Sequence, residues 1–546
     1  MLLYFALIAV FFVAHIGFMT THFSQRTGNT WPWEIWILIS LLMFSAGAGW
    51  LSVVYPVTIG YGAGYLTLIF VLGLLVGKPW RKHSFVLPSV GEFSVLVAIA
   101  LVFSVGGAAQ ISYNDTLIYH TQAIKWIQEY PVVPGLGNLH TRFAFNSHVF
   151  TAAAGSSFAY NGALIYPFNT CLLITSLALI LRYAKRASFA QNAIPPVVYA
   201  LLVLIVILLY PSWAHTPSSD IAIAALTIVA FVVAWNAMVT PRIADVILLS
   251  ALIATAISYK LSTLFLVLLP VYIAWRVMRL NGALSVRRSV GWSLLVFVVV
   301  LSPFAVRNVI LSGYLVYPLP GVDLFDFDWK IPLATAQFDS DYITAWARIP
   351  WVPVYEVLAM PFTEWFPVWL GKKSIPFIIL LLGTAMSLFA LVWSVVKRNT
   401  SVQLTLIVVW VNVVFWWVTA PDPRFIHGIL FVATTITAGV VLQTMSVAQL
   451  PWRLTQIAIA VALVLAPFTI KDDLRLLVTN HLLYPRAYPQ GEQTWVRTEL
   501  ATYRIPSVDN QCYDAPLPCA EKPIDQLEMR GKTLAEGYRI KSNESP

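Results

Sequence analysis

Charged residues are rare in this sequence, and cysteine is rarer still. The chain has 34 Lys or Arg and 25 Asp or Glu, so charged residues make up only 11% of its 546 positions, whereas a soluble globular domain carries roughly a quarter. Apolar residues make up 59%, and the mean hydropathy is +0.75. This composition excludes an ordinary soluble enzyme and predicts an all-α polytopic membrane protein.

The few charges are spread unevenly along the chain. Residues 471–546 hold 10 Lys or Arg and 11 Asp or Glu, so this polar tail contributes a charge of −1. The formal net charge of +9 therefore arises in the first 470 residues. Cytoplasmic loops of membrane proteins collect Lys and Arg for topological reasons, so the positive charge does not indicate a nucleic-acid partner.

The chain has three cysteines. Cys171 lies in an apolar run and is expected to be a small buried hydrophobic residue. Cys512 and Cys519 lie close together in the tail, where a disulfide between them would imply an oxidising compartment. The tail is too polar to span a membrane, and it is long enough to fold as a small cap.

Runs of about 17–25 mostly apolar residues predict membrane-spanning helices. The first run lacks the basic start and the small-residue cleavage site of a secretory signal peptide, so we expect it to be a helix of the protein. Fourteen such runs are present, at residues 1–19, 33–54, 57–76, 91–109, 160–181, 195–210, 220–239, 243–258, 261–279, 290–310, 375–396, 402–419, 425–446 and 454–470.

The basic residues predict which loops face the cytoplasm. With the N-terminus outside, every inside loop has at least one Lys or Arg, and the short outside loops have almost none. The number of spans depends on whether 243–258 and 261–279 are two helices or one. A single helix would place the basic residues of all later loops outside, so we expect two. The predicted inside loops contain Arg26; Lys78, Arg81 and Lys82; Arg182, Lys185 and Arg186; Arg242; Arg276, Arg279, Arg287 and Arg288; Lys397 and Arg398; and Arg453.

Four segments lie outside in this topology: residues 110–159, the turn at 211–219, the loop at 311–374 and the tail. In a bacterium, the protein would sit in the inner membrane with both termini in the periplasm. We divide the chain into three accessory helices at 1–90, a transmembrane core at 91–470 that includes both long external loops, and a periplasmic tail at 471–546.

Asp115 follows the predicted span 91–109 and opens a segment that is expected to be helical as far as Tyr130. Its apolar and polar residues fall on opposite faces, which is typical of a helix lying flat in the membrane interface. Asp115 could cap this helix, a role that does not exclude catalysis. The apolar face is formed by Tyr119, Ala123, Trp126, Ile127 and Tyr130, and the polar face by Gln122, Lys125 and Glu129.

Other charged residues from distant parts of the sequence are predicted at the same surface: Asp220, Lys260, Arg307, Asp422 and Arg424. Each has an ordinary explanation, such as a well-bonded loop, a helix cap in the case of Asp220, or a long cation that reaches the lipid headgroups. Together, cations at this depth suit a phosphate or diphosphate group. A carboxylate beside them suits a general base acting on an acceptor hydroxyl. The sequence thus predicts transfer from a lipid phosphate donor at the outer leaflet.

Four short motifs carry a family resemblance. The chain resembles the integral-membrane glycosyltransferases of the GT-C fold, which include the protein O-mannosyltransferases and the bacterial aminoarabinose transferases of lipid A. The resemblance covers roughly residues 91–425. The motifs are Asn114-Asp115 followed by Tyr119, the segment from Thr141-Arg142-Phe143 to His148, the Arg307-Asn308, Gly313 and Tyr317-Pro318 series, and Asp422-Pro423-Arg424-Phe425.

The resemblance implies an inverting transfer of a sugar from a polyprenyl-phosphate carrier to a glycan, lipid or protein acceptor of the cell envelope. It implies Asp115 as the catalytic base. The cations that would hold the donor phosphate are Arg142, Lys260, Arg307 and Arg424, and the residues that would bind substrate are His120, His140, Asn146, His148, Asp220, Tyr317 and Asp422. The sequence has no His-Glu-x-x-His or paired-cysteine metal motif, and since only some relatives need a divalent metal, a metal cofactor is left open.

Three other functions are open. An O-antigen ligase or polymerase would also use a lipid-diphosphate donor, with Arg348 or His148 as functional residues. A lipid or glycan transporter is disfavoured, because transporters place polar residues near the bilayer midplane, whereas here they cluster at one face. A non-catalytic scaffold is the third, and Asp115→Ala separates it from an enzyme.

The predicted external loop 311–374 is rich in carboxylates and indoles. Such residues suit sugar rings, but interfacial anchoring is the more common reason for a set of tryptophans. The segment 351–370 is expected to form a second interfacial helix or a partial lid. The residues concerned are Asp323, Asp326, Asp328, Asp339 and Asp341, and Trp329, Trp346, Trp351, Trp365 and Trp369.

Overall fold

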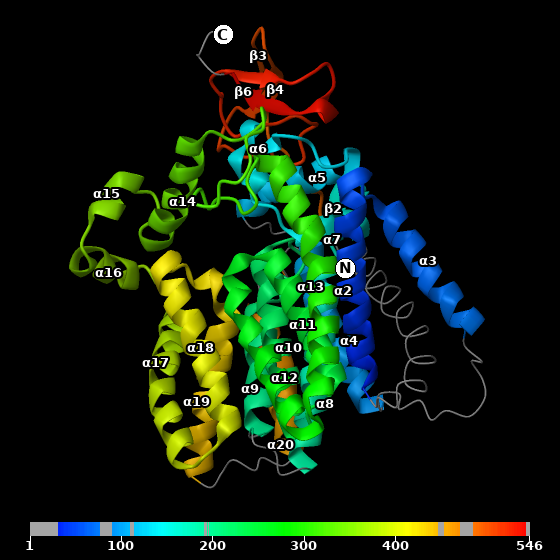
Figure 1. Cartoon of the computed structure of the whole chain (residues 1–546), viewed down its shortest axis with the longest axis vertical. Helices are drawn as coiled ribbons and strands as arrows, with labels where there is room; N and C mark the ends of the chain where they lie inside the picture. Colours follow the sequence, from blue (N-terminus) through cyan, green and yellow to red (C-terminus); the bar gives the residue numbers. More distant parts are fainter. Residues whose placement is uncertain are drawn as a thin grey trace.

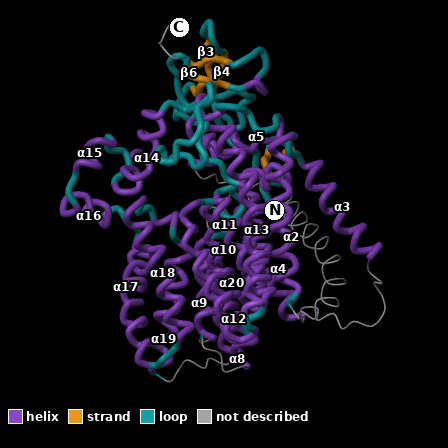
Figure 2. Tube along the Cα trace, in the orientation of Figure 1, coloured by secondary structure: helices purple, strands orange, loops and turns teal. Residues whose placement is uncertain are grey.

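The structure is a computed structural model that describes residues 31–76, 90–109, 114–189, 194, 196–445, 452–469, 475 and 484–541. Most of these residues are helical, and a small β-containing cap stands at one end of the helical bundle (Figures 1 and 2). The bundle contains α2 (Trp33–Val54), α4 (Val90–Ala109), α8 (Phe168–Phe189), α9 (Pro196–Leu209), α10 (Ser219–Val239), α11 (Ile243–Tyr259), α12 (Leu268–Asn281), α13 (Ala283–Ser312), α17 (Ile375–Val396), α18 (Thr400–Thr419), α19 (His427–Thr444) and α20 (Trp452–Thr469). Helix α3 (Ile59–Val76) diverges from the bundle (Figure 1).

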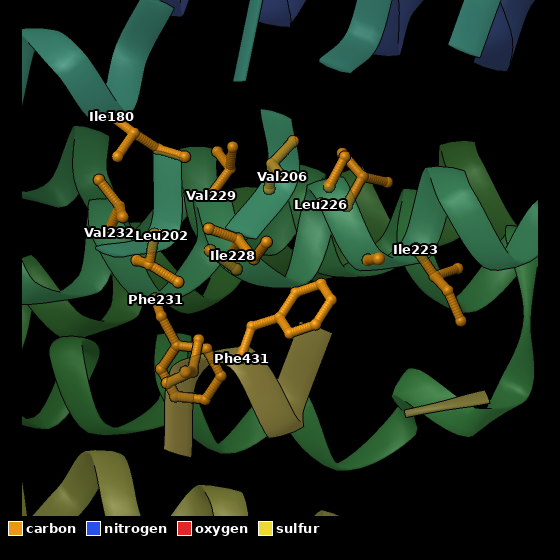
Figure 3. Packing of buried hydrophobic residues seen from close by; sticks show 14 of the residues in the cluster. Ile180, Leu202, Val206, Ile223, Leu226, Ile228, Val229, Phe231, Val232 and Phe431 are labelled. Carbon is orange, nitrogen blue, oxygen red and sulfur yellow. The ribbon is translucent and has the colours of Figure 1, made fainter. Parts of the chain in front are cut away.

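Eight of the described helices are long and apolar enough to cross a membrane, and three shorter apolar helices accompany them. The chain is therefore a multi-pass membrane protein, as its composition predicts. Helix α10 lies at the centre of the bundle, and 94% of the residues in its apolar stretch are buried inside the protein. Such burial is typical of a helix that is apolar on all sides. Phe231 of α10 belongs to one core cluster with Ile180 of α8, Leu202 of α9 and Phe431 of α19 (Figure 3).

Every predicted span from residue 33 onward overlaps an observed helix, and the predicted break at Tyr259-Lys260 is present. Helix α11 ends at Tyr259, Lys260 is extended with φ −162° and ψ 130°, and the 3-10 helix η3 (Leu261–Val267) then leads into α12. Cys171 is fully buried, as predicted. The predicted span 1–19 lies outside the described residues, and the total of fourteen crossings stays a prediction.

The predicted start of the span at residue 160 is wrong. Strands β1 (Phe158–Tyr160) and β2 (Ala163–Ile165) form an antiparallel hairpin there, and α8 begins only at Phe168. The hairpin turns through Asn161 and Gly162, both with positive φ (48° and 76°). Asn-Gly is the preferred dipeptide of a two-residue hairpin turn, since both residues tolerate this conformation. The apolar composition of the segment concealed this turn signal.

Helix α2, one of the predicted accessory helices, is part of the main core. Its Leu38, Leu41 and Phe44 are buried in the same cluster as α10. Near its start, Glu34 accepts a hydrogen bond from Arg182 of α8 at 3.0 Å. The three-part division of the chain stays a prediction, with α2 as the helix that ties its first part to the bundle.

The predicted external segments 110–159 and 311–374 form short helices that gather toward the end of the bundle where the cap lies (Figure 1). Asn138 of the first segment donates a hydrogen bond to the carbonyl of Trp329 in the second at 2.8 Å. The membrane side on which they lie stays a prediction. The helices are η1 (Thr116–His120), α5 (Thr121–Glu129), α6 (Leu136–Leu139), η2 (Thr141–Ala144), α7 (His148–Ser156), α14 (Leu333–Arg348), α15 (Val354–Ala359) and α16 (Phe362–Gly371).

The cap is formed by the tail and is built on two hairpins. Strand β3 (Gln493–Arg497) pairs with β4 (Thr502–Pro506), and β5 (Leu527–Met529) pairs with β6 (Tyr538–Ile540), both antiparallel. A 3-10 turn, η5 (Leu534–Glu536), precedes β6, and a disulfide joins Cys512 to Cys519. Tyr503 and Tyr538 of the cap are buried in one cluster with Trp126 of α5, so the cap is packed onto the external loop 110–159.

Candidate active site

Asp115 lies at the start of a continuous helical segment, as the sequence predicts. Residues 114 and 115 are helical, η1 is a π-helical turn, and α5 follows without a break. The Asp115 side chain makes no capping hydrogen bond, so the interpretation of this carboxylate as an N-cap is wrong. The cap covers part of the predicted polar face of α5: Gln122 is fully buried, whereas Glu129 at the end of the helix is exposed.

The Asp115 carboxylate lies between two arginines from distant parts of the chain. Its Oδ2 is 3.0 Å from an Nη of Arg424, and its Oδ1 is 3.8 Å from an Nη of Arg142. The Asp115 side chain is 26% exposed, so a hydroxyl group from outside can approach it. The second distance exceeds that of a hydrogen bond, so the contact of Asp115 with Arg142 is an ion pair alone.

Arg424 is held by a turn that its own neighbours form. In η4 (Pro423–Phe425) the Asp422 carboxylate accepts hydrogen bonds from the Arg424 amide at 2.9 Å and from its guanidinium at 3.1 and 3.2 Å. Burial alone would raise the pKa of Asp422, but the charge and hydrogen bonds of Arg424 lower it below the usual value. Asp422 is therefore a carboxylate that orients Arg424 toward Asp115.

Two tryptophan side chains donate hydrogen bonds to backbone carbonyls of the same turn. Trp416 donates to the carbonyl of Asp422 at 2.7 Å, and Trp369 of α16 donates to that of Pro421 at 2.9 Å. Trp369 and Trp365 are almost fully buried against Trp417 of α18. These two tryptophans of the loop 311–374 are thus packing residues.

Lys260 and Asp220 form a second ion pair next to the first. The Lys260 ammonium donates a hydrogen bond to Asp220 and lies 3.5 Å from the centre of the Phe425 ring, the residue after Arg424. The helix cap here is Ser218, whose hydroxyl accepts from the Asp220 amide, so the interpretation of Asp220 as the cap is wrong. Instead, Asp220 orients Lys260 at the extended residue between α11 and η3.

Two histidines next to these ion pairs are buried and uncharged. Burial lowers the pKa of His120 to about 4 and that of His140 to about 3. His120 shares a hydrogen bond with the Thr116 hydroxyl at 3.1 Å, and the Nδ1 of His140 accepts from the Arg142 amide. At neutral pH both rings are neutral, so they shape the cluster and add no charge to it.

Arg142 also borders residues that sequence reasoning missed. Its guanidinium lies 5.7 Å from the centre of the Tyr119 ring and interacts electrostatically with the Tyr342 hydroxyl of α14. From the cap, the Glu521 carboxylate reaches within 3.7 Å of His140 and acts electrostatically on Arg142. Neither Tyr342 nor Glu521 lies in a motif, and only the fold brings them to this position.

Arg307, Asn146 and His148 lie apart from the Asp115 cluster. The Arg307 side chain is 4% exposed and donates to the carbonyl and hydroxyl of Ser52 at 3.3 and 3.0 Å and to the Asn146 side chain at 3.1 Å. His148 is buried between Gly49 and Phe304. The structure therefore does not bring Arg307 to the Asp115 cluster, and its Nε and one Nη are hydrogen-bonded to Asn146 and Ser52 instead.

Arg307→Met is expected to destabilise the fold and to leave donor binding unchanged. The substitution would strand buried acceptors of Ser52 and Asn146, which costs about 1–3 kcal/mol. Thermal unfolding of the purified protein in detergent measures the loss. A variant that unfolds like the wild type but no longer binds a polyprenyl phosphate would return Arg307 to the site.

Tyr317 also lies outside the cluster, in a small network beside Arg142. Its hydroxyl donates to Asp339 of α14 at 2.6 Å, and Asp339 is hydrogen-bonded to Thr141, the residue before Arg142. Burial raises the pKa of Asp339 above its ordinary value. Tyr317 thus connects α14 to the turn that carries Arg142.

No group of three or more His, Cys, Asp or Glu side chains able to hold a metal ion occurs in the part of the chain that the structure describes. The carboxylates of Asp115, Asp220 and Asp422 are each paired with a cation. A divalent metal therefore has no preformed protein cage among these described residues.

The comparisons with known proteins give a family and a likeness to a solved structure. A family model described as "Domain of unknown function (DUF8201)" matches residues 1–431 of the 546. The chain belongs to the DUF8201 family. No curated protein sequence matches the chain. Among solved structures, the chain is similar to arabinosyltransferase EmbB from Mycobacterium smegmatis, with 11% identity and a TM-score of 0.37 over 81% of this chain and 49% of that one. The chain thus spans about half the length of that structure.

Proposed function

We propose that this DUF8201 protein is an integral-membrane glycosyltransferase that moves a sugar from a polyprenyl-phosphate donor to a cell-envelope acceptor on the periplasmic face. The observation that carries the proposal is the exposed Asp115 carboxylate between Arg142 and Arg424, at the end of the bundle where the external loops gather. A base beside phosphate-binding cations is the arrangement that such a transfer needs.

In the proposed reaction, the Asp115 carboxylate accepts the proton of an acceptor hydroxyl. The hydroxyl oxygen forms a bond to the anomeric carbon of the sugar from the face opposite the phosphate, and the bond from that carbon to the phosphate oxygen breaks. The polyprenyl phosphate leaves with the electron pair, and the cations stabilise its charge. The configuration at the anomeric carbon is inverted.

Arg142 is the best-placed cation for the donor phosphate. Its closest Asp115 oxygen is 3.8 Å away, while Arg424 is hydrogen-bonded to both Asp115 and Asp422, and Lys260 is hydrogen-bonded to Asp220. A phosphate that enters next to Arg142 can also reach Arg424, since both guanidinium groups flank the same carboxylate. Lys260 and Arg424 both contact the Phe425 ring, at 3.5 and 5.8 Å from its centre, and Lys260 adds charge at longer range.

The contacts of Arg348 and His148 count against an O-antigen ligase or polymerase. Arg348 lies over the Trp365 ring at 5.0 Å, and His148 is buried near Phe304. Neither residue belongs to the Asp115 cluster. An enzyme that used Arg348 or His148 would therefore have its functional groups apart from the partly exposed Asp115 carboxylate.

One face of α14 is a candidate surface for the acceptor. Phe338, Tyr342 and Trp346 lie one turn apart with ring centres 6.2 and 5.7 Å from their neighbours, and Trp351 continues the series at 4.6 Å. Trp351 is 83% exposed and has a positive φ of 70°, which is unusual for a bulky residue. The series runs past Arg142, which interacts electrostatically with Tyr342. Exposed aromatic faces that lead to the site suit a sugar-containing acceptor.

Trp346→Ala and Trp351→Ala are each expected to raise the apparent KM for the acceptor about threefold to tenfold, since an aromatic contact is worth about 0.5–1.5 kcal/mol. The rate at saturating acceptor should not change. Transfer assays over a dilution series of envelope acceptor measure this. Tyr355→Ala, at an exposed aromatic residue of α15 outside the series, is the matched control. An equal effect of the control would indicate membrane anchoring instead.

The proposal as a whole is tested with membranes from a deletion strain that carries a plasmid copy of the gene. Addition of labelled polyprenyl-phosphate sugars should give label in the envelope fraction only when the protein is present. If every donor gives the same label with and without the protein, the proposed function is wrong.

A further inference from the structure

The disulfide-closed segment of the cap lies directly on the helix that carries Asp115. The backbone amide of Tyr513 donates a hydrogen bond to the carbonyl of Leu117 at 2.9 Å. Leu117 is the second residue of the π-helical turn η1, two positions after Asp115. A part of the chain almost 400 residues away in sequence thus binds the backbone beside the proposed base.

The π-helical turn decides where Asp115 points. A π turn contains one residue more than the corresponding α-helical turn, and each residue of a helix turns the chain by about 100°. Asp115 therefore faces Arg424 and Arg142 only while the extra residue is accommodated in η1. Regular α-helix through residues 116–120 would rotate Asp115 away from both arginines.

Groups of the tail help to keep the carbonyls of this turn hydrogen-bonded. The Thr116 carbonyl accepts from the Thr121 hydroxyl at 3.0 Å, and the same hydroxyl contacts that of Tyr488 at 2.7 Å. The Leu117 carbonyl accepts from Tyr513. The Thr116 carbonyl also accepts from the Thr121 backbone amide, so the Thr121 hydroxyl and the Tyr513 amide add further hydrogen bonds to carbonyls of this turn and favour the π turn over a regular helix.

Side chains of α5 bind the disulfide-closed segment from the other side. Gln122 donates to the carbonyls of Ala515 at 2.8 Å and Tyr513 at 3.2 Å. The Lys125 ammonium pairs with Asp514 at 2.8 Å. The segment therefore contacts both η1 and α5, so a shift of the segment would change the position of Asp115.

The backbone of the segment needs to be held in place. Tyr513 in the segment has a positive φ of 48°, as do Asp509 and Asn510 just before it, with 63° and 55°. This conformation is uncommon for a bulky non-glycine residue such as Tyr513. The Cys512–Cys519 disulfide flanks Tyr513 and closes the loop. A cross-link of this kind reduces the other conformations open to the loop.

We propose that the Cys512–Cys519 segment is a positioning element for Asp115: it holds the π turn η1 and thereby aims the carboxylate at the acceptor hydroxyl. The inference rests on the proposed function and deepens it. It makes the transferase dependent on an oxidised tail. The segment touches no substrate in this account and acts only through η1 and α5.

The first test reads the position of the helix without any substrate. Hydrogen–deuterium exchange of residues 114–129 is followed in the full-length protein in lipid nanodiscs, for the wild type, for C512S/C519S and for Gln122→Leu. Gln122→Leu removes the α5 donor while the disulfide stays intact. Both variants should speed exchange in 116–122 about tenfold, with α10 unchanged.

Arg530→Ala is the matched control. Arg530 joins the cap to Asp328 by two hydrogen bonds at 2.8 and 3.0 Å, in contacts that involve neither η1 nor α5. Exchange in 116–122 should stay at the wild-type rate in this variant. If Arg530→Ala speeds exchange as much as the other two, the cap stabilises the fold in general and the positioning role is wrong. If none of the three changes it, the role is equally wrong.

The second test uses transfer kinetics and separates positioning from general stability. Gln122→Leu should lower kcat about tenfold with the KM for the donor unchanged, and it should have no further effect in a D115N background. Equal effects of Gln122→Leu in both backgrounds would overturn the positioning role. Absence of any transfer by the wild type would overturn the proposed function instead, while the exchange result would still stand.

Discussion

Asp115→Asn is expected to lower the rate of sugar transfer about 10²–10⁴-fold, the contribution that a positioned general base commonly makes. Asparagine has the same shape and can still accept a hydrogen bond from Arg424, but it cannot take up the proton of the acceptor hydroxyl. Binding of the donor should be kept, since the variant removes a negative charge next to the two arginines that are proposed to hold the phosphate. The time course of label transfer in membranes of the deletion strain measures the rate.

Asp341→Asn is the matched control for this substitution. Asp341 belongs to α14 on the same end of the protein, and its carboxylate accepts a hydrogen bond from the exposed Gln337. It should transfer at the wild-type rate. Thermal unfolding of D115N confirms that the protein is still folded. A D115N variant that is folded and transfers within threefold of the wild type would remove Asp115 from catalysis.

Arg424→Ala is the second large effect, with an expected loss of about 10²-fold or more in kcat/KM for the donor. Arg424 hydrogen-bonds both Asp115 and Asp422, so its removal takes away a phosphate ligand and also the partner that fixes the base. Both kinetic constants should change: the KM for the donor should rise, and kcat should decrease.

Arg424→Lys and Arg142→Ala distinguish the two roles of Arg424. Lysine keeps the charge but cannot bridge two carboxylates with a planar fork, so we expect most of the kcat loss and a smaller rise in KM. Arg142→Ala should raise the KM for the donor with a smaller effect on kcat, because Arg142 makes only the long ion pair with Asp115. The same donor titration measures all three variants. A wild-type KM for Arg424→Ala would contradict the phosphate-binding role.

The helices of the bundle could be predicted from the sequence because lipid-facing and buried helices share one signal, a long apolar run. The break at Lys260 followed from the parity of the basic loops, and the structure has an extended residue there. The start of α8 failed for the reverse reason. The β1–β2 hairpin is as apolar as a span, and Asn161-Gly162 is a local signal that the hydropathy of the segment does not register.

The site could be predicted only as far as single residues and motifs reach. Asp115 and Arg424 come from two motifs separated by 309 positions, and the fold brings them to 3.0 Å. Arg307 also lies near the end of an apolar helix, the pattern from which phosphate binding was predicted, yet it is hydrogen-bonded to Ser52 and Asn146 in the interior. Which cation faces the carboxylate depends on contacts across the chain that a sequence pattern does not contain.

The contacts of the tail were also only partly predictable from the sequence. Cys512 and Cys519 lie close together in the tail sequence, which makes a disulfide between them an expectation, and the structure contains it. The docking partner of the tail was not predictable, because several of its contacts are made to backbone groups of Pro134, Leu117 and Ala108, and every residue type has such groups. Glu521 reaches His140 only as a consequence of that docking.

The central claim is that the protein transfers a sugar from a lipid-linked donor and that Asp115 carries out the step. Mass spectrometry of the lipid-linked and envelope glycans tests it most directly, in the deletion strain and in the same strain with a plasmid copy of the wild type or of D115N. We predict that one glycan lacks a sugar, and that its donor accumulates, in the deletion and D115N strains, and that the wild-type copy restores both. Identical glycans in all strains would contradict the transferase, and full restoration by D115N would contradict the role of Asp115.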